Sequence, residues 1–110
     1  MVEECFVTDL TGCYAVIFTN ELRDNHDGYD DMAARMIELS ADQPGYLGVK
    51  SVREGGAGIT VSYWKDQASI AAWKAHAEHS LARQQGRETF YQSYELQVCL
   101  IERAYDFNFS

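Results

Sequence analysis

The sequence predicts an α+β fold in which four strands and two helices follow the order β-α-β-β-α-β. The segments 14–22, 46–53, 59–65 and 91–103 are rich in β-branched and aromatic residues, as strands are. A glycine-rich linker at 54–58 joins the second and third segments as a hairpin. Two stretches carry apolar residues at helical spacing, one between the first and second segments and one between the third and fourth. This order is the split β-α-β unit of ferredoxin-like folds, built on an antiparallel sheet.

The first strand, residues 14–22, is apolar on both faces. Val16 and Phe18 share one face with Asn20, and Ile17 stands on the other. We therefore expect both faces of this strand to be buried.

Acidic residues mark the start of the first helix. Asp27 is expected to cap it, with Asp30 and Asp31 in the first turn, where the helix dipole favours negative charge. Pro44 and the following Gly45 end it. The helix buries one stripe, formed by Tyr29, Met32, Ala33, Met36 and Ile37. The acidic run lacks a calcium-loop pattern and is interpreted as a solvated face.

The second half of the chain supplies the other helix and the last strand. Asp66 is expected to cap a helix from Gln67 to about Ala75, with helical structure continuing over 77–85. The strand at 91–103 places one apolar row, Leu96, Val98 and Leu100, opposite a more polar one. Because helices cover only one face of such a sheet, the apolar residues left on the other face predict a homodimer.

Length and charge limit what the protein does. With 110 residues there is room for one domain, which we place at 14–105 between a lead-in at 1–13 and a tail at 106–110. The net charge of −8 argues against binding to nucleic acids or to an anionic membrane surface. No apolar run approaches the roughly 20 residues of a membrane span.

The cysteines and the N-terminus indicate a cytoplasmic protein. Cys5, Cys13 and Cys99 are odd in number and form no C-x-x-C motif, which favours reduced thiols over disulfides or zinc. The acidic start is unlike a signal peptide. The glycine linker precedes a strand and lacks a phosphate-loop lysine, and the sequence contains no dinucleotide fingerprint.

A set of motifs runs through residues 14–105. It comprises the segments 18–22, 62–66 and 102–105, with Trp73, His76, His79 and the pair Phe90-Tyr91. Together these motifs resemble the signature of the antibiotic biosynthesis monooxygenase family. The resemblance implies a dimeric α/β barrel with one pocket per subunit between sheet and helices. Some relatives oxygenate phenols, quinols or anthrones without metal or flavin, whereas others bind haem and cleave its ring.

Asn20 is the most informative polar residue. An amide among large apolar neighbours needs partners, or it costs about 1–3 kcal/mol. It therefore either donates to a substrate oxygen or oxyanion, or is a structural amide bonded to backbone near the strand end. The matching asparagine in the haem-degrading and anthrone-oxidising relatives is a pocket residue.

Other candidates follow from residue type and from the resemblance. Trp73 is either a pocket wall or core packing, and Trp64 is expected in the core. His76 and His79 are neighbours on a helix and suit proton transfer, but a third metal ligand is missing, so no metal site is expected. Groups expected at the pocket or its rim are Phe18, Tyr63, Arg83, Tyr91 and Tyr94.

We therefore predict a cofactor-independent monooxygenase that acts on an electron-rich aromatic molecule with molecular oxygen. Two alternatives stay open: a haem-binding or haem-degrading protein, and a non-catalytic small-molecule-binding dimer. Haem degradation is disfavoured because Arg83 occupies the position at which those relatives have their axial histidine.

Overall fold

The computed structural model describes residues 9–78 and 90–109. Its elements are β1 (Tyr14–Leu22), α1 (Tyr29–Ala41), β2 (Tyr46–Glu54), β3 (Ala57–Trp64), α2 (Gln67–Glu78) and β4 (Tyr91–Leu100). The four strands form one antiparallel sheet in the order β2-β3-β1-β4. The predicted ferredoxin-like α+β fold is confirmed.

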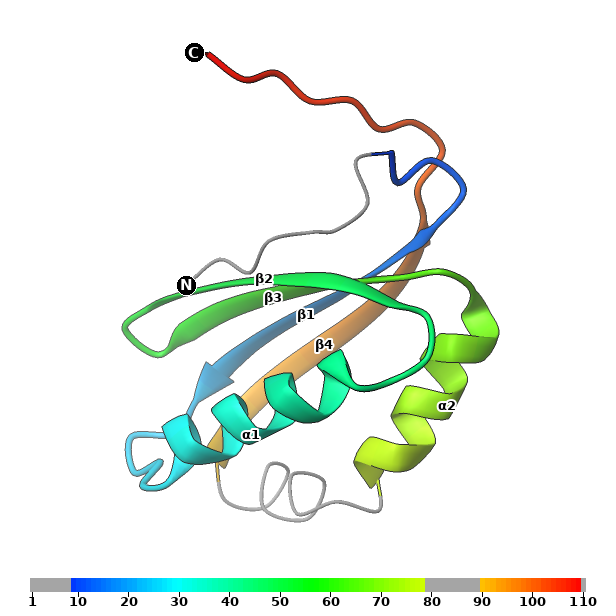
Figure 1. Cartoon of the computed structure of the whole chain (residues 1–110). Coiled ribbons are helices and arrows are strands. Elements are labelled where there is room, and N and C mark those ends of the chain that lie inside the picture. The colour runs from blue at the N-terminus through cyan, green and yellow to red at the C-terminus, as the bar shows by residue number, and fades with distance from the viewer. Residues whose placement is uncertain (1–8, 79–89, 110) are drawn as a thin grey trace.

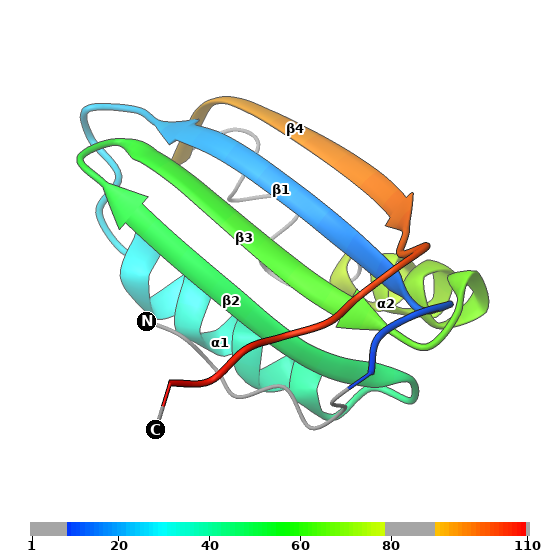
Figure 2. The ribbon, with the colours of Figure 1, turned by 90° about the horizontal axis from the view of Figure 1, so that it is seen from above.

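Both helices lie on one side of the sheet, and the other side is open (Figure 1). Viewed onto the open side, α1 and α2 lie behind the sheet and β4 forms one edge (Figure 2). Beyond β4 the chain leaves the sheet, and the rings of Tyr105, Phe107 and Phe109 are exposed. Neither described helix is long and apolar enough to cross a membrane.

The strand register decides which side chains share the helix side. Along β1, Tyr14 pairs with Trp64 and Asn20 pairs with Gly58, so alternate residues of the two strands stand on one face. Contacts with both helices identify this face. Tyr29 of α1 accepts a hydrogen bond from Arg53, the strand partner of Gly58, and Trp73 of α2 stacks on Trp64.

The core centres on Trp64, whose side chain has no exposed surface. Its ring lies edge-on to Tyr46, with centroids 5.7 Å apart, and is stacked on Trp73 at 6.1 Å. Its indole N–H donates to the Ser62 hydroxyl at 2.9 Å. The expectation that Trp64 is a core residue is confirmed, and its contacts join β2, β3 and α2.

The two helix starts differ from each other. Asp66 caps α2 as expected, because its carboxylate accepts from the Ser69 hydroxyl and backbone N–H, which holds the pKa of Asp66 below its usual value. The expected Asp27 cap of α1 is wrong. Gly28 occupies that position with a φ of 88°, and no side chain caps the helix. A left-handed backbone, which glycine adopts easily, makes the turn into α1.

Two predicted boundaries shift, those of the hairpin and of the last strand. The hairpin turn is only Gly55-Gly56, with Gly55 at a φ of 61°, so β2 and β3 are paired from Glu54 and Ala57 onward. The expected helical continuation beyond Ala75 is present as far as Glu78, and residues 79–85 of that prediction lie outside the described residues. Strand β4 ends at Leu100 rather than near residue 103.

Candidate functional site

A row of four residues crosses the sheet near the C-terminal end of β1. Asn20 pairs with Gly58 of β3 on one side and with Tyr94 of β4 on the other, and Gly58 pairs with Arg53 of β2. A Cβ atom at Gly58 would collide with the Arg53 guanidinium. Because Gly58 has no side chain, the guanidinium lies across it and reaches Asn20 two strands away.

Arg53 connects three parts of the fold. Its Nη2 donates to Asn20 Oδ1 at 2.7 Å and to the Tyr29 hydroxyl at 2.9 Å. Its Nη1 donates to the Gly56 carbonyl at 3.0 Å, and the guanidinium carbon lies 4.9 Å from the centre of the Tyr29 ring. Strand β1, helix α1 and the β2–β3 hairpin therefore meet at one cationic side chain.

Asn20 is buried, at 5% exposure, and its two amide ends are not equivalent. A guanidinium only donates hydrogen bonds, so the amide oxygen must face Arg53 and Nδ2 must point elsewhere. In the described part of the chain, Nδ2 is buried without a hydrogen-bond partner. Leaving such a donor unpaired costs about 1–3 kcal/mol. Among the described residues, Nδ2 is thus left without an acceptor, in an orientation that Arg53 fixes.

Aromatic rings gather around the same end of the sheet. Phe18 lies 5.6 Å from both Tyr91 and Tyr94, measured between ring centroids. Tyr29 lies 5.7 Å from Phe90 and 5.8 Å from Tyr91. We call these five residues the aromatic cluster. Burial raises the pKa of the Tyr91 phenol above its usual value.

Trp73 and His76 lie at the other end of the helix side. Trp73 stacks on Trp64, and its ring centroid is 5.9 Å from that of His76, which is exposed on α2. Trp64 pairs with Tyr14, six residues before Asn20 on β1. At ~3.3 Å per strand residue the two rows are about 20 Å apart. Asn20 and Trp73 are therefore too far apart to contact the same small group.

An apolar strip on β4 lies between these two ends. Leu96, Val98 and Leu100 pair with Phe18, Val16 and Tyr14, so they stand on the helix side of the sheet. Their exposed fractions are 57%, 46% and 53%. Together with the aromatic cluster, the strip offers a long apolar surface with a polar donor at one end.

The remaining predicted site residues lie in different parts of the structure. Phe18 and Tyr91 belong to the aromatic cluster. Tyr63 pairs with Ala15 on the open face, where Lys50 Nζ lies 5.6 Å from its ring centre, so it does not share a face with Asn20. His79 and Arg83 lie outside the described residues.

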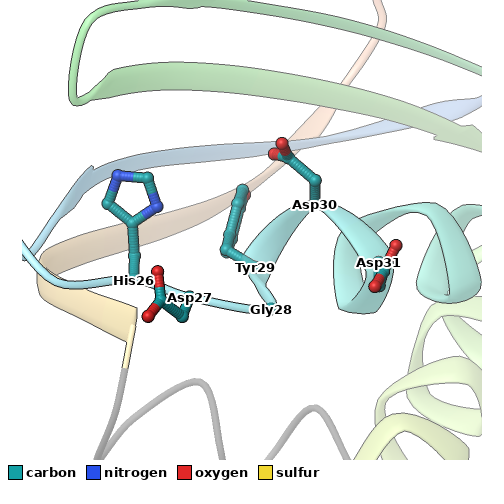
Figure 3. A pocket seen from close by; sticks show the side chains of 6 residues that line it. All are labelled: His26, Asp27, Gly28, Tyr29, Asp30 and Asp31. Carbon is teal, nitrogen blue, oxygen red and sulfur yellow. The ribbon is translucent and has the colours of Figure 1, made fainter.

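A pocket of about 380 Å³ opens at the start of α1 (Figure 3). It is lined by the turn before the helix and its first residues, namely His26, Asp27, Gly28, Tyr29, Asp30 and Asp31. Of these only Tyr29 belongs to the aromatic cluster. The described residues contain no cluster of three or more potential metal ligands. We assign this pocket no function.

Arg53 and Tyr29 were not among the predicted site residues. Their roles depend on register, which places residues from β2, β3 and β1 in one row. One signal was present: Gly58 sits inside a strand, where a glycine often marks a close approach by another group.

Comparison with known proteins identifies the family. The sequence profile of the family described as antibiotic biosynthesis monooxygenase matches residues 14–85. The chain belongs to this family. YqjZ of Bacillus subtilis, an uncharacterised protein, is 50% identical over 91 residues, which are 82% of this chain and 80% of that protein.

A more distant relative is named for a monooxygenase activity. Jasmonate monooxygenase ABM of Pyricularia oryzae is 29% identical over 89 residues. The match spans 77% of this chain but only 41% of the fungal protein.

Solved structures of other proteins share the fold. SnoaB of Streptomyces nogalater, a cofactor-independent oxygenase, superposes with a TM-score of 0.72 at 13% identity over 86% of this chain and 97% of that one. MupZ of Pseudomonas fluorescens gives 0.65 at 15% identity over 84% and 73%.

Proposed function

We propose that the protein is a monooxygenase that oxidises an electron-rich aromatic molecule, such as a phenol, quinol or anthrone, with molecular oxygen and without metal or flavin. One observation supports this most: the buried Nδ2 of Asn20 has no hydrogen-bond partner among the described residues, and Asn20 pairs with Tyr94 of the aromatic cluster. A buried donor held in a fixed orientation suits a substrate oxygen that becomes an anion. Membership of the monooxygenase family adds independent support.

The chemistry requires the protein to stabilise a substrate anion. Triplet oxygen reacts poorly with closed-shell molecules, but a deprotonated phenol or anthrone donates one electron to it. For an anthrone, the ring CH₂ first loses a proton, and the carbanion combines with O₂ as a peroxide. Protonation of the peroxide and loss of water then leave a carbonyl. One oxygen atom enters the substrate, and the other leaves as water with both CH₂ hydrogens.

The candidate residues differ in their roles in this proposal. Asn20 donates to the substrate oxyanion, and Phe18 and Tyr91 form apolar walls around the ring. Trp73 and His76 lie near the Trp64 row, about 20 Å along β1 from Asn20, which is farther than a phenol, quinol or anthrone extends. They are therefore given no contact with the reacting ring, and His79, outside the described residues, remains the candidate proton acceptor. Arg83 remains a candidate rim residue for holding a carboxylate or phenolate. Tyr63 is left out of the site because it stands on the open face.

Oxygen consumption tests the proposed activity. The purified protein should consume one O₂ per molecule of a substrate drawn from a panel of hydroquinones, phenols and anthrones. With ¹⁸O₂, one labelled atom should enter the product. Uptake no faster than in protein-free buffer for the entire panel would refute the activity. A saturable Soret shift during a haem titration would favour haem binding instead.

We further propose a homodimer that covers the open face of the sheet. Val52 and Ile59 form a cross-strand pair there, with exposed fractions of 59% and 46%. Sedimentation at micromolar concentration should give about twice the chain mass of 12.5 kDa. Placing a charge in the interface with Ile59→Lys should shift the protein toward monomer, while the same change at exposed Ala34 of α1 should not. A stable wild-type monomer would contradict the dimer.

A further inference from the structure

The geometry points to Arg53 as a positioning residue that aims the Asn20 donor at the substrate and makes the site prefer an anionic aromatic ligand. This inference rests on the proposed function and assigns a role to a second residue of that site. Arg53 itself need not touch the substrate, because it acts through the amide of Asn20.

Arg53 fixes the orientation of the Asn20 side-chain amide. An asparagine amide can be turned over at little cost, which exchanges its oxygen and nitrogen. The 2.7 Å bond from Arg53 prevents this exchange, because turning the amide would set two donors against each other. Arg53 is in turn held by the Tyr29 hydroxyl and the Gly56 carbonyl. The Nδ2 donor therefore stays directed away from Arg53 before any ligand arrives.

The sheet is built to admit this contact. Arg53 and Asn20 belong to β2 and β1, with β3 between them. At the crossing point β3 has Gly58, and a Cβ there would occupy the space of the guanidinium. A larger residue would hold a strand interior better than glycine does. The missing side chain is therefore what permits Arg53 to reach Asn20.

Arg53 also acts through its charge. A cation bonded to the amide oxygen draws electron density from the amide and strengthens its N–H as a donor. Within the described ranges, Arg53 forms no ion pair with a carboxylate, so its charge is not cancelled at contact distance. A positive charge near a phenol favours the phenolate form. Orientation and charge thus both select the anion that reacts with oxygen.

The test compares single and double variants. We expect Arg53→Met to lower the oxygen uptake rate by about tenfold or more, because the variant loses a hydrogen bond from a charged group to Asn20. If Arg53 acts through Asn20, the same change should have much less effect when Asn20 is already alanine. Lys50→Met is the matched control, since Lys50 lies on β2 but faces the open side. Equal rate losses from Arg53→Met in both backgrounds would overturn the inference.

Binding of 4-nitrophenol provides a readout that needs no turnover, because its ring is electron-poor and resists oxidation. The wild type should bind the yellow phenolate more tightly than the neutral phenol. Arg53→Met should reduce that preference, and Arg53→Lys should restore part of it, since lysine keeps the charge but not the planar fork. If Arg53→Met does not fold, the preference for phenolate over phenol is compared between Arg53→Lys and the wild type, and Arg53→Lys should show the weaker preference.

The outcomes separate the two proposals. Phenolate selection that depends on Arg53, without oxygen uptake on any substrate, refutes the oxygenase and supports the role of Arg53 in binding. Oxygen uptake with an unchanged phenolate preference in Arg53→Met refutes the role of Arg53 alone.

Discussion

Replacing Asn20 with alanine is expected to lower the turnover rate by about 10²–10³ while the domain stays folded. The amide is buried at 5% exposure, and its Nδ2 has no partner in the described residues. A donor to the developing oxyanion acts mainly in the transition state, so its loss should reduce kcat and kcat/KM together. The measurement is oxygen uptake per folded molecule on a substrate that the wild type turns over.

The stability of the same variant distinguishes a functional amide from a structural one. Alanine removes an unsatisfied buried donor, and Arg53 keeps its bonds to Tyr29 and Gly56. We therefore expect the melting temperature of Asn20→Ala to stay near that of the wild type. Asn20→Asp is the companion variant: it offers Arg53 a carboxylate, but it has no N–H to give and should be inactive. A large fall in melting temperature with an unchanged rate would show Asn20 to be structural.

Trp64→Ala should produce the largest loss of stability. Trp64 is fully buried between Tyr46 and Trp73, and truncating such a residue typically costs about 3–5 kcal/mol. Small domains have about 5–15 kcal/mol in total, so the variant should be close to unfolding. We expect the melting temperature to fall by more than about 10 °C.

Trp73→Ala is the matched control for Trp64→Ala. Trp73 is only partly buried, and its removal leaves Trp64 packed against Tyr46 and bonded to Ser62. It should therefore cost less stability than Trp64→Ala. Equal losses from the two variants, or a Trp64→Ala protein as stable as the wild type, would contradict the assignment of Trp64 to the centre of the core.

The fold was predictable because local patterns and the global arrangement agree. The predicted first strand has the observed bounds, and the glycines at 54–58 correctly indicated a hairpin. The alternation of Leu96, Val98 and Leu100 matches their pairing with β1 on the helix side. The Asp27 cap failed because the turn uses the left-handed backbone of Gly28, and residue type alone does not reveal which of two adjacent candidates starts a helix.

The candidate site was less predictable because its contacts join residues of different strands, and the sequence alone does not give the register between them. Asn20 was singled out as a candidate from its apolar neighbours, but its partner Arg53 is 33 positions away and reaches it across Gly58, which has no side chain. Tyr63 was placed at the pocket rim on residue type, whereas register puts it on the open face. Sequence motifs also do not reveal how far apart their residues lie in space. Trp64 pairs with a β1 residue six positions before Asn20, so the two motifs lie at opposite ends of the strand.

The side-chain amide signal of Asn20 in a proton–nitrogen correlation spectrum shows directly whether Nδ2 donates to a bound anion. Its absence from the spectrum of Asn20→Asp assigns it. On titration with 4-nitrophenolate, we expect a saturable downfield shift of one Nδ2 proton, as a donor without a partner among the described residues acquires an anionic acceptor. If 4-nitrophenolate binds while this signal stays unchanged, Asn20 is not the anion donor and the proposed site is wrong.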